Sequence, residues 1–142
     1  MSGNNYPLNL EQIKADIFIA KSMIVEAKNR TPKAAKYIKA QAGYHLQQAA
    51  EKMIKIQIYY SGQNLDLNKM YKHPLPNLIA YAQSLGVNLI VPRYVQQNQV
   101  PISAWEAQGR YDVHMVVKIM QLEKAYEEIE NWCEELKNNG YK

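Results

Sequence analysis

The segment Tyr44–Lys55, which reads YHLQQAAEKMIK, is expected to form the central part of the longest helix of this chain. Its apolar residues recur three and four positions apart, so they lie on one side of an α-helix and predict that this side faces a core. They are Leu46, Ala49, Ala50, Met53 and Ile54. Polar side chains border this stripe, and each must find a hydrogen-bond partner or stay in contact with water. They are His45, Gln47, Gln48 and Glu51.

The same helix extends in both directions from this segment. Thr31 is a good N-cap and Pro32 suits a first helical position, which predicts a helix that runs to about Tyr60. Its first turns carry Lys33, Lys36 and Lys39, although cations are unfavourable near the positive end of a helix dipole. Two interpretations remain open: a solvated lysine face, or lysines that meet phosphates while the interleaved tyrosines meet bases.

The remaining chain predicts further helices. Asn9 and Gln12 can cap a helix that ends near Lys28, and a shorter helix from Leu75 ends at Gly86. The segment 87–100 has no clean period and is expected to be irregular, with one helical turn at 94–97.

Two start signals mark the last third of the chain. Ser103 and Glu106 fit a capping box that starts a short helix, which is expected to end near Gly109. Asp112 can cap the final helix, which ends at 138–140. On this prediction Arg110 lies outside the final helix, and the apolar stripe of that helix includes Val113, Val116, Met120, Ile129, Trp132 or Cys133, and Leu136.

Together these elements predict an all-α fold. Four main helices with short connections indicate an up-and-down four-helix bundle, with one or two short extra helices between the third and last main helices. The 142 residues are expected to form a single domain over 1–142, with an ordered core at about 8–138.

The composition indicates the cellular compartment in which the protein is expected and the groups that it is expected to bind. The single cysteine, Cys133, has no partner for an internal disulfide, and its neighbours suggest a buried thiol. No metal-ligand spacing and no cofactor-binding motif occurs, so neither a metal nor a cofactor is expected. The chain has no signal-peptide pattern and no apolar run long enough to span a membrane. We therefore expect a cytoplasmic protein without membrane contact.

The net charge of +4 is distributed unevenly. Residues 1–72 carry 11 basic and 5 acidic side chains, whereas residues 73–142 carry 6 basic and 8 acidic ones. The basic surplus therefore belongs to the first two helices, and it is compatible with an anionic partner such as a nucleic acid.

Three segments together resemble HEPN domains, which are small all-helical modules. The segments are His45–Lys52 with Lys55 following, His73–Leu78, and Gly109–Asp112. The resemblance covers most of the chain, from about Leu10 to Leu136. It implies a homodimer, an association with nucleotides or RNA, and a small nucleotidyltransferase as partner, as in a toxin–antitoxin pair.

The resemblance also suggests a catalytic pair. Catalytic HEPN proteins are metal-independent RNases in which an arginine is followed, after four to six intervening residues, by a histidine. By this resemblance Arg110 would hold the scissile phosphate, and His114 would exchange a proton with the ribose hydroxyl or the leaving oxygen. Only three residues separate them here, which departs from the family pattern. A salt bridge for Arg110 and a hydrogen-bonded surface imidazole for His114 are the structural alternatives.

A polar cluster on the long helix is the second candidate site. His45, Gln48, Glu51 and Lys52 are placed to face Arg110 and Tyr111 across the bundle and to bind a nucleotide or RNA. The alternative is a satisfied hydrogen-bond layer that fixes the helix register. Glu51 and Lys55 are also expected to form an ion pair within the helix.

Three functions follow from these patterns. The first is a HEPN-type homodimeric module that works beside a nucleotidyltransferase. The second is a metal-independent endoribonuclease that uses Arg110 and His114. The third is a purely structural subunit that binds only protein.

Overall fold

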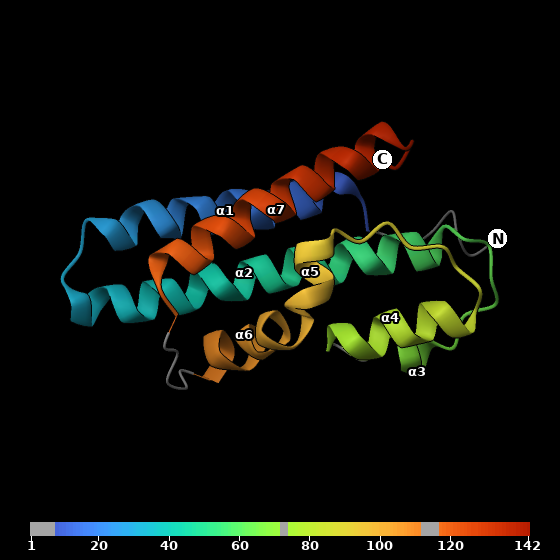
Figure 1. The fold of residues 1–142 in the computed structure, drawn as a ribbon, viewed down its shortest axis with the longest axis horizontal. Helices are drawn as coiled ribbons and strands as arrows, with labels where there is room; N and C mark the ends of the chain where they lie inside the picture. The colour runs from blue at the N-terminus through green and yellow to red at the C-terminus, as the bar shows by residue number, and fades with distance from the viewer. Residues whose placement is uncertain (1–7, 72–73, 112–116) are drawn as a thin grey trace.

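The computed structural model describes residues 8–71, 74–111 and 117–142, without the side chains of residues 108–111. This part of the chain forms seven helices and no strand, which confirms the all-α prediction. The helices are α1 (Leu10–Lys28), α2 (Pro32–Tyr59), α3 (Leu67–Met70), α4 (Leu75–Ser84), α5 (Arg93–Gln97), α6 (Gln99–Tyr111) and α7 (Ile119–Asn138). Helix α2 lies at the centre, with α1 and α7 on one side and α4 and α6 on the other (Figure 1).

The first two helices begin where the sequence predicts. Asn9 and Gln12 form a capping box, in which each backbone N–H donates to the other's side-chain oxygen at 3.0 Å. Thr31 caps α2 by accepting from the N–H of Ala34, and Pro32 occupies the first helical position. Beyond α2, Gly62 adopts a positive φ of 80°, a conformation that glycine reaches without strain and that stops the helix.

The core forms around α2. The apolar stripe predicted within Tyr44–Lys55 is fully buried, and the two alanines at 49 and 50 have no exposed surface. Small side chains at these positions let neighbouring backbones approach closely. Helix α7 contributes Trp132, which is also fully buried, and Cys133 is buried as predicted. Burial raises the pKa of the Cys133 thiol, so this residue is an inert part of the core.

The irregular segment 87–92 is attached to α2 by one side chain. Gln57 accepts from the Ile90 N–H at 2.7 Å and donates to the Ile90 carbonyl at 2.9 Å. The indole N–H of Trp132 donates to the same carbonyl at 2.7 Å. The side-chain amide of Gln57 therefore pairs with the backbone N–H and C=O of Ile90 in the way that a neighbouring strand would. Without it, these two groups would lack the hydrogen bonds that a helix or sheet provides.

Helix α6 corrects the prediction of a short helix from Ser103 to about Gly109. The helix begins four residues earlier, at Gln99, and runs to Tyr111. The early start is possible because Pro101 lies in the first turn, where a missing N–H is not needed. Ser103 is instead inside α6, where its hydroxyl donates to the Gln99 carbonyl and accepts from the N–H of Leu75, at the start of α4. It therefore caps a different helix from the one expected.

The start of the last helix also differs from the prediction. Helix α7 begins at Ile119, and the N–H of Lys118 donates to the side-chain oxygen of Gln121. Asp112, Val113 and Val116 lie outside the described residues. The placement of Met120 in the core was wrong, because its side chain is 78% exposed. Met120 precedes the buried Ile129 by nine residues, which is about two and a half turns, so the two lie on opposite sides of α7.

Candidate functional site

Three ionisable side chains meet where α1 packs against α2. Asp16, on α1, accepts from His45 Nδ1 at 3.0 Å through one carboxylate oxygen. Its other oxygen accepts from Lys52 Nζ at 2.6 Å. We call these three residues the Asp16 cluster. The Asp16 side chain is 10% exposed, whereas those of His45 and Lys52 are 23% and 32% exposed. The carboxylate is therefore enclosed while its two partners reach the surface.

The hydrogen bonds of the Asp16 cluster fix its charge state. Burial alone would raise the pKa of Asp16, but the bonds from His45 and Lys52 and the charge of Lys52 outweigh that effect, so the pKa lies below its ordinary value. An ionised carboxylate can only accept, so Nδ1 of His45 carries the proton of the shared bond. Among the described residues, Nε2 of His45 has no hydrogen-bond partner.

A second polar group lies within α2 itself. Gln47, which is fully buried, donates to Glu51 at 3.0 Å and accepts from Gln48 at 2.7 Å. Glu51 also pairs with Lys55 at 2.7 Å, which confirms the ion pair expected one turn apart. The glutamine at 47, seen in the sequence only as part of the polar border, thus connects two of the predicted site residues, Gln48 and Glu51.

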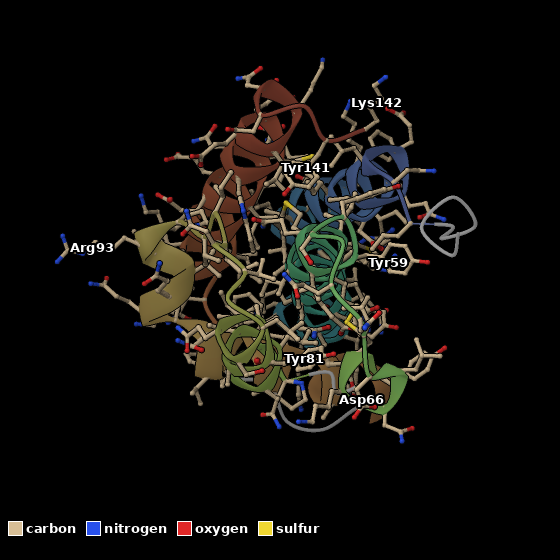
Figure 2. All side chains as sticks on the ribbon, turned by 90° about the vertical axis from the view of Figure 1, so that its right-hand side faces the viewer. Tyr59, Asp66, Tyr81, Arg93, Tyr141 and Lys142 are labelled. Carbon is tan, nitrogen blue, oxygen red and sulfur yellow. The ribbon has the colours of Figure 1, made fainter. Side chains whose placement is uncertain are left out.

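A narrow strip of α2 remains open to solvent near these two groups. Its residues are three or four positions apart, so they follow one line along the helix. We call Tyr37, Gln41, Tyr44, Gln48, Lys52, Lys55 and Tyr59 the α2 strip; all are exposed or half-buried. In the end-on view of Figure 2, Tyr59 lies on the outer side of α2, and α5 and α7 lie on the opposite side. The strip combines aromatic rings, amides and ammonium groups.

The lysines of the first turns of α2 are placed beside this strip. Lys33 is exposed, and the ammonium group of Lys36 lies 5.7 Å from the ring centre of Tyr37. Helix α2 contains five lysines and one glutamate, so its net charge of +4 equals that of the whole chain. About 18 Å of helix separates Lys33 from His45 at 1.5 Å per residue, so the lysines extend the polar region and do not join the Asp16 cluster.

The predicted catalytic pair is only partly located. Arg110 lies outside the final helix α7, as predicted, but its backbone and that of Tyr111 belong to the last turn of α6, which runs beyond the expected end near Gly109. His114 and the side chains of Arg110 and Tyr111 lie outside the described residues. The prediction that His45, Gln48, Glu51 and Lys52 face Arg110 and Tyr111 therefore stays a prediction.

The sequence did not reveal the roles of two residues: Asp16, which belongs to the candidate site, and Gln57, which belongs to the core. Asp16 lies three residues after Ile13 and four before Ala20, which are both fully buried. An acidic residue at a core position of an amphipathic helix needs a buried partner. That position was therefore a usable signal for Asp16, and the basic residues at 45 and 52 were candidates for its partners.

The structure gives no indication of a metal or a membrane span in the part that it describes. No group of three histidine, cysteine or acidic side chains is placed to hold a metal ion among the described residues. None of the described helices is both long enough and apolar enough to cross a membrane.

Comparisons with known proteins gave no match. Neither the family models nor the curated proteins nor the solved structures that were compared match this chain.

Proposed function

We propose that this protein is a HEPN-type helical module that binds RNA or nucleotides along the α2 strip. In this proposal the chain is an up-and-down bundle of four main helices and acts as a homodimer. Its partner is a small nucleotidyltransferase, in the manner of a toxin–antitoxin pair. The support is the resemblance of three ordered segments, together with the all-helical architecture and the polar surface of α2.

The observation that carries the proposal is the coincidence of charge and aromatic rings on α2. Single-stranded nucleic acids bind to surfaces where basic groups follow the backbone and aromatic rings stack on bases. Tyr37 is 47% exposed next to Lys36, and Tyr44 lies beside His45 with ring centres 5.2 Å apart. The ammonium groups of Lys52 and Lys55 are already paired with carboxylates, so the uncompensated charge comes from Lys33, Lys36 and Lys39, of which the first two lie nearest the start of α2.

The first prediction concerns these two lysines. The double substitution Lys33→Glu and Lys36→Glu should weaken binding of a fluorescent single-stranded oligoribonucleotide by about tenfold or more, because it replaces attraction to phosphates by repulsion. It should also lower the slope of log Kd against log salt by about 1.4, since each lost contact to a single strand contributes about 0.7. Fluorescence anisotropy over a salt series measures both quantities.

The matched control reverses two charges elsewhere. Lys124 and Lys137 are exposed on α7, and the double substitution to glutamate changes the net charge by the same amount. Binding by this control should stay close to wild type. Equal losses in both variants would indicate only a general charge effect. RNA binding that is absent at low salt, or that does not respond to salt, would contradict the proposal and favour a subunit that binds only protein.

A metal-independent endoribonuclease is the competing function. The observation in its favour is that α6, which packs against α2, ends with the turn that contains Arg110. Arg110 therefore belongs to a helix that packs directly against α2, the helix that carries the α2 strip. The shortened Arg110–His114 spacing is the reason that we propose binding and not cleavage as the function.

The second prediction separates these functions. If the protein is an RNase, it should cleave a generic RNA in the presence of a chelator, and Arg110→Ala or His114→Ala should abolish cleavage while leaving RNA affinity within about threefold. If binding is the function, the RNA should remain intact at high protein concentration. Gel analysis of labelled RNA gives the readout, and activity that persists in both variants would point to a contaminating nuclease.

A further inference from the structure

Helix α1 has an exposed stripe on the side that faces away from the core. Its members are three or four residues apart and follow the spacing of a coiled-coil seam. We call Glu11, Ala15, Phe18, Ser22, Val25 and Asn29 the α1 stripe; every one of them is exposed. Phe18 is the only phenylalanine in the chain and is 71% exposed, and Val25 is 48% exposed. The helices that pack most extensively on α1 are α2 and α7, and they lie on its other sides.

The sizes of the side chains in this stripe alternate. Ala15 is small, Phe18 large, Ser22 small and Val25 large. An antiparallel pair of identical helices with its two-fold axis near residue 20 places residue 18 opposite residue 22, and residue 15 opposite residue 25. Each large side chain then faces a small one, which is the arrangement that close packing between helices favours.

We propose that two copies of this chain associate through antiparallel packing of the α1 stripe. The interface is isologous: Phe18 packs over Ser22 of the second copy, and Ala15 contacts Val25 of the second copy. This inference rests on the homodimer of the proposed function and names the surface that forms it.

The charges at the ends of α1 favour the antiparallel direction. Glu11 lies near the start of the helix, whereas Lys28 and Arg30 lie at its end. Antiparallel packing brings Glu11 to Asn29 of the second copy and close to the neighbouring Arg30, which also pairs with Glu26 of its own chain. Parallel packing would bring like charges together at both ends.

One flank of the stripe carries three lysines that face the same flank of the second copy. Each lysine already interacts within its own chain: Lys14 with Glu11 at 3.3 Å, Lys28 with Glu123, and Lys21 with the ring of Tyr126 at 4.8 Å. These contacts draw the ammonium groups toward acidic or aromatic partners, which lowers their repulsion across the two-fold axis. The least favourable contact is that between Lys21 of one chain and Lys21 of the second copy. Because salt screens this repulsion, the association constant should increase with salt concentration.

The third prediction uses an exchange of side chains within the stripe. Phe18→Ser should weaken dimerisation by about tenfold or more, because it removes the largest side chain of the interface. The exchange variant Phe18→Ser with Ser22→Phe should restore the dimer, since the same pair then meets with the two positions reversed. Sedimentation equilibrium over a concentration series measures the association constant, and circular dichroism shows that each variant is folded.

The control removes an equally exposed apolar side chain. Met120, on α7, is 78% exposed and lies outside the α1 stripe, so Met120→Ser should leave dimerisation unchanged. A dimer that survives Phe18→Ser, or an exchange variant that stays monomeric, would overturn the proposed interface.

Cysteine cross-linking tests the direction of the two helices. In antiparallel packing, residues 15 of the two copies lie about 15 Å apart along the axis, too far for a disulfide. The variant Ala15→Cys should therefore not cross-link with itself, but a mixture of Ala15→Cys and Val25→Cys chains should form a covalent dimer. Cys133 is buried and should not interfere. Self-cross-linking of Ala15→Cys would overturn the antiparallel arrangement.

The outcomes distinguish this inference from the proposed function. A dimer that persists without Phe18 would reject the interface and keep the homodimer, while a wild-type chain that stays monomeric at all concentrations would reject both. RNA affinity of the Phe18→Ser monomer, measured by the anisotropy assay above, reports on the α2 strip separately.

Discussion

Replacing Asp16 by alanine should lower the free energy of unfolding at pH 7 by about 2–3 kcal/mol. The carboxylate is enclosed at the contact between α1 and α2 and holds two cationic or polar partners. Removing it leaves a small cavity and takes away the group that satisfies His45 and Lys52. The loss is smaller than for a fully buried pair, because both partners can turn toward water.

This loss should depend on pH. The pKa of Asp16 is lower in the folded chain than its ordinary value of 3.8. The carboxylate therefore contributes its full stabilisation above the ordinary pKa, and the contribution disappears as the pH falls through the lower folded pKa. Urea unfolding of wild type and Asp16→Ala should give a difference that is constant from pH 7 to about pH 5 and shrinks toward pH 2.

A control variant shows whether the effect belongs to the buried carboxylate. Glu134 is exposed on α7, and Glu134→Ala should change the free energy of unfolding by no more than about 0.5 kcal/mol. A double-mutant cycle of Asp16→Ala with Lys52→Ala should also give a coupling energy above about 0.5 kcal/mol. If the wild type and Asp16→Ala differed equally at pH 7 and pH 2, the ionic account of this cluster would be wrong.

Replacing Gln57 by leucine should lower the free energy of unfolding by about 2–3 kcal/mol. Leucine has nearly the same size but cannot make the two hydrogen bonds to Ile90, so the N–H of that residue loses its partner. Trp132 still donates to the Ile90 carbonyl, which limits the loss. Chemical unfolding followed by circular dichroism gives the free energy.

The matched control for Gln57 is another glutamine. Gln83 is exposed on α4, so Gln83→Leu should change the free energy by about 0.5 kcal/mol or less. Amide exchange gives a local test as well, because the N–H of Ile90 should exchange faster in Gln57→Leu while the middle of α7 remains protected. Wild-type stability in Gln57→Leu would show that water replaces the lost bonds without cost.

Helices α1 and α2 were predictable because local signals and the global fold agree in them. Asn9, Thr31 and Pro32 mark their own helix starts by side-chain chemistry, and the apolar stripe of α2 has a clear period. The glycines at 62 and 86 mark helix ends for an equally local reason. Each signal acts within four residues of its effect, so the sequence alone is sufficient.

The errors lie where a residue acts on a distant part of the chain. Ser103 looks like the cap of its own helix, but its hydroxyl serves Leu75, 28 residues earlier. Gln57 looks like an ordinary polar residue of α2, but its partner is Ile90. The Asp16 cluster combines two helices in the same way. Periodicity predicts which side of a helix is buried, but it does not identify the group that a buried polar side chain will meet.

The central position of α2 determines which parts of this chain can unfold locally. Its middle is enclosed by α1, α6 and α7, so exposing the backbone there requires the separation of several helices at once. Helix α3 packs mainly on α4 and can detach while the rest stays assembled. A protease should therefore first cut near α3, and the amide protons of residues 46–54 should be the last to be replaced by deuterium.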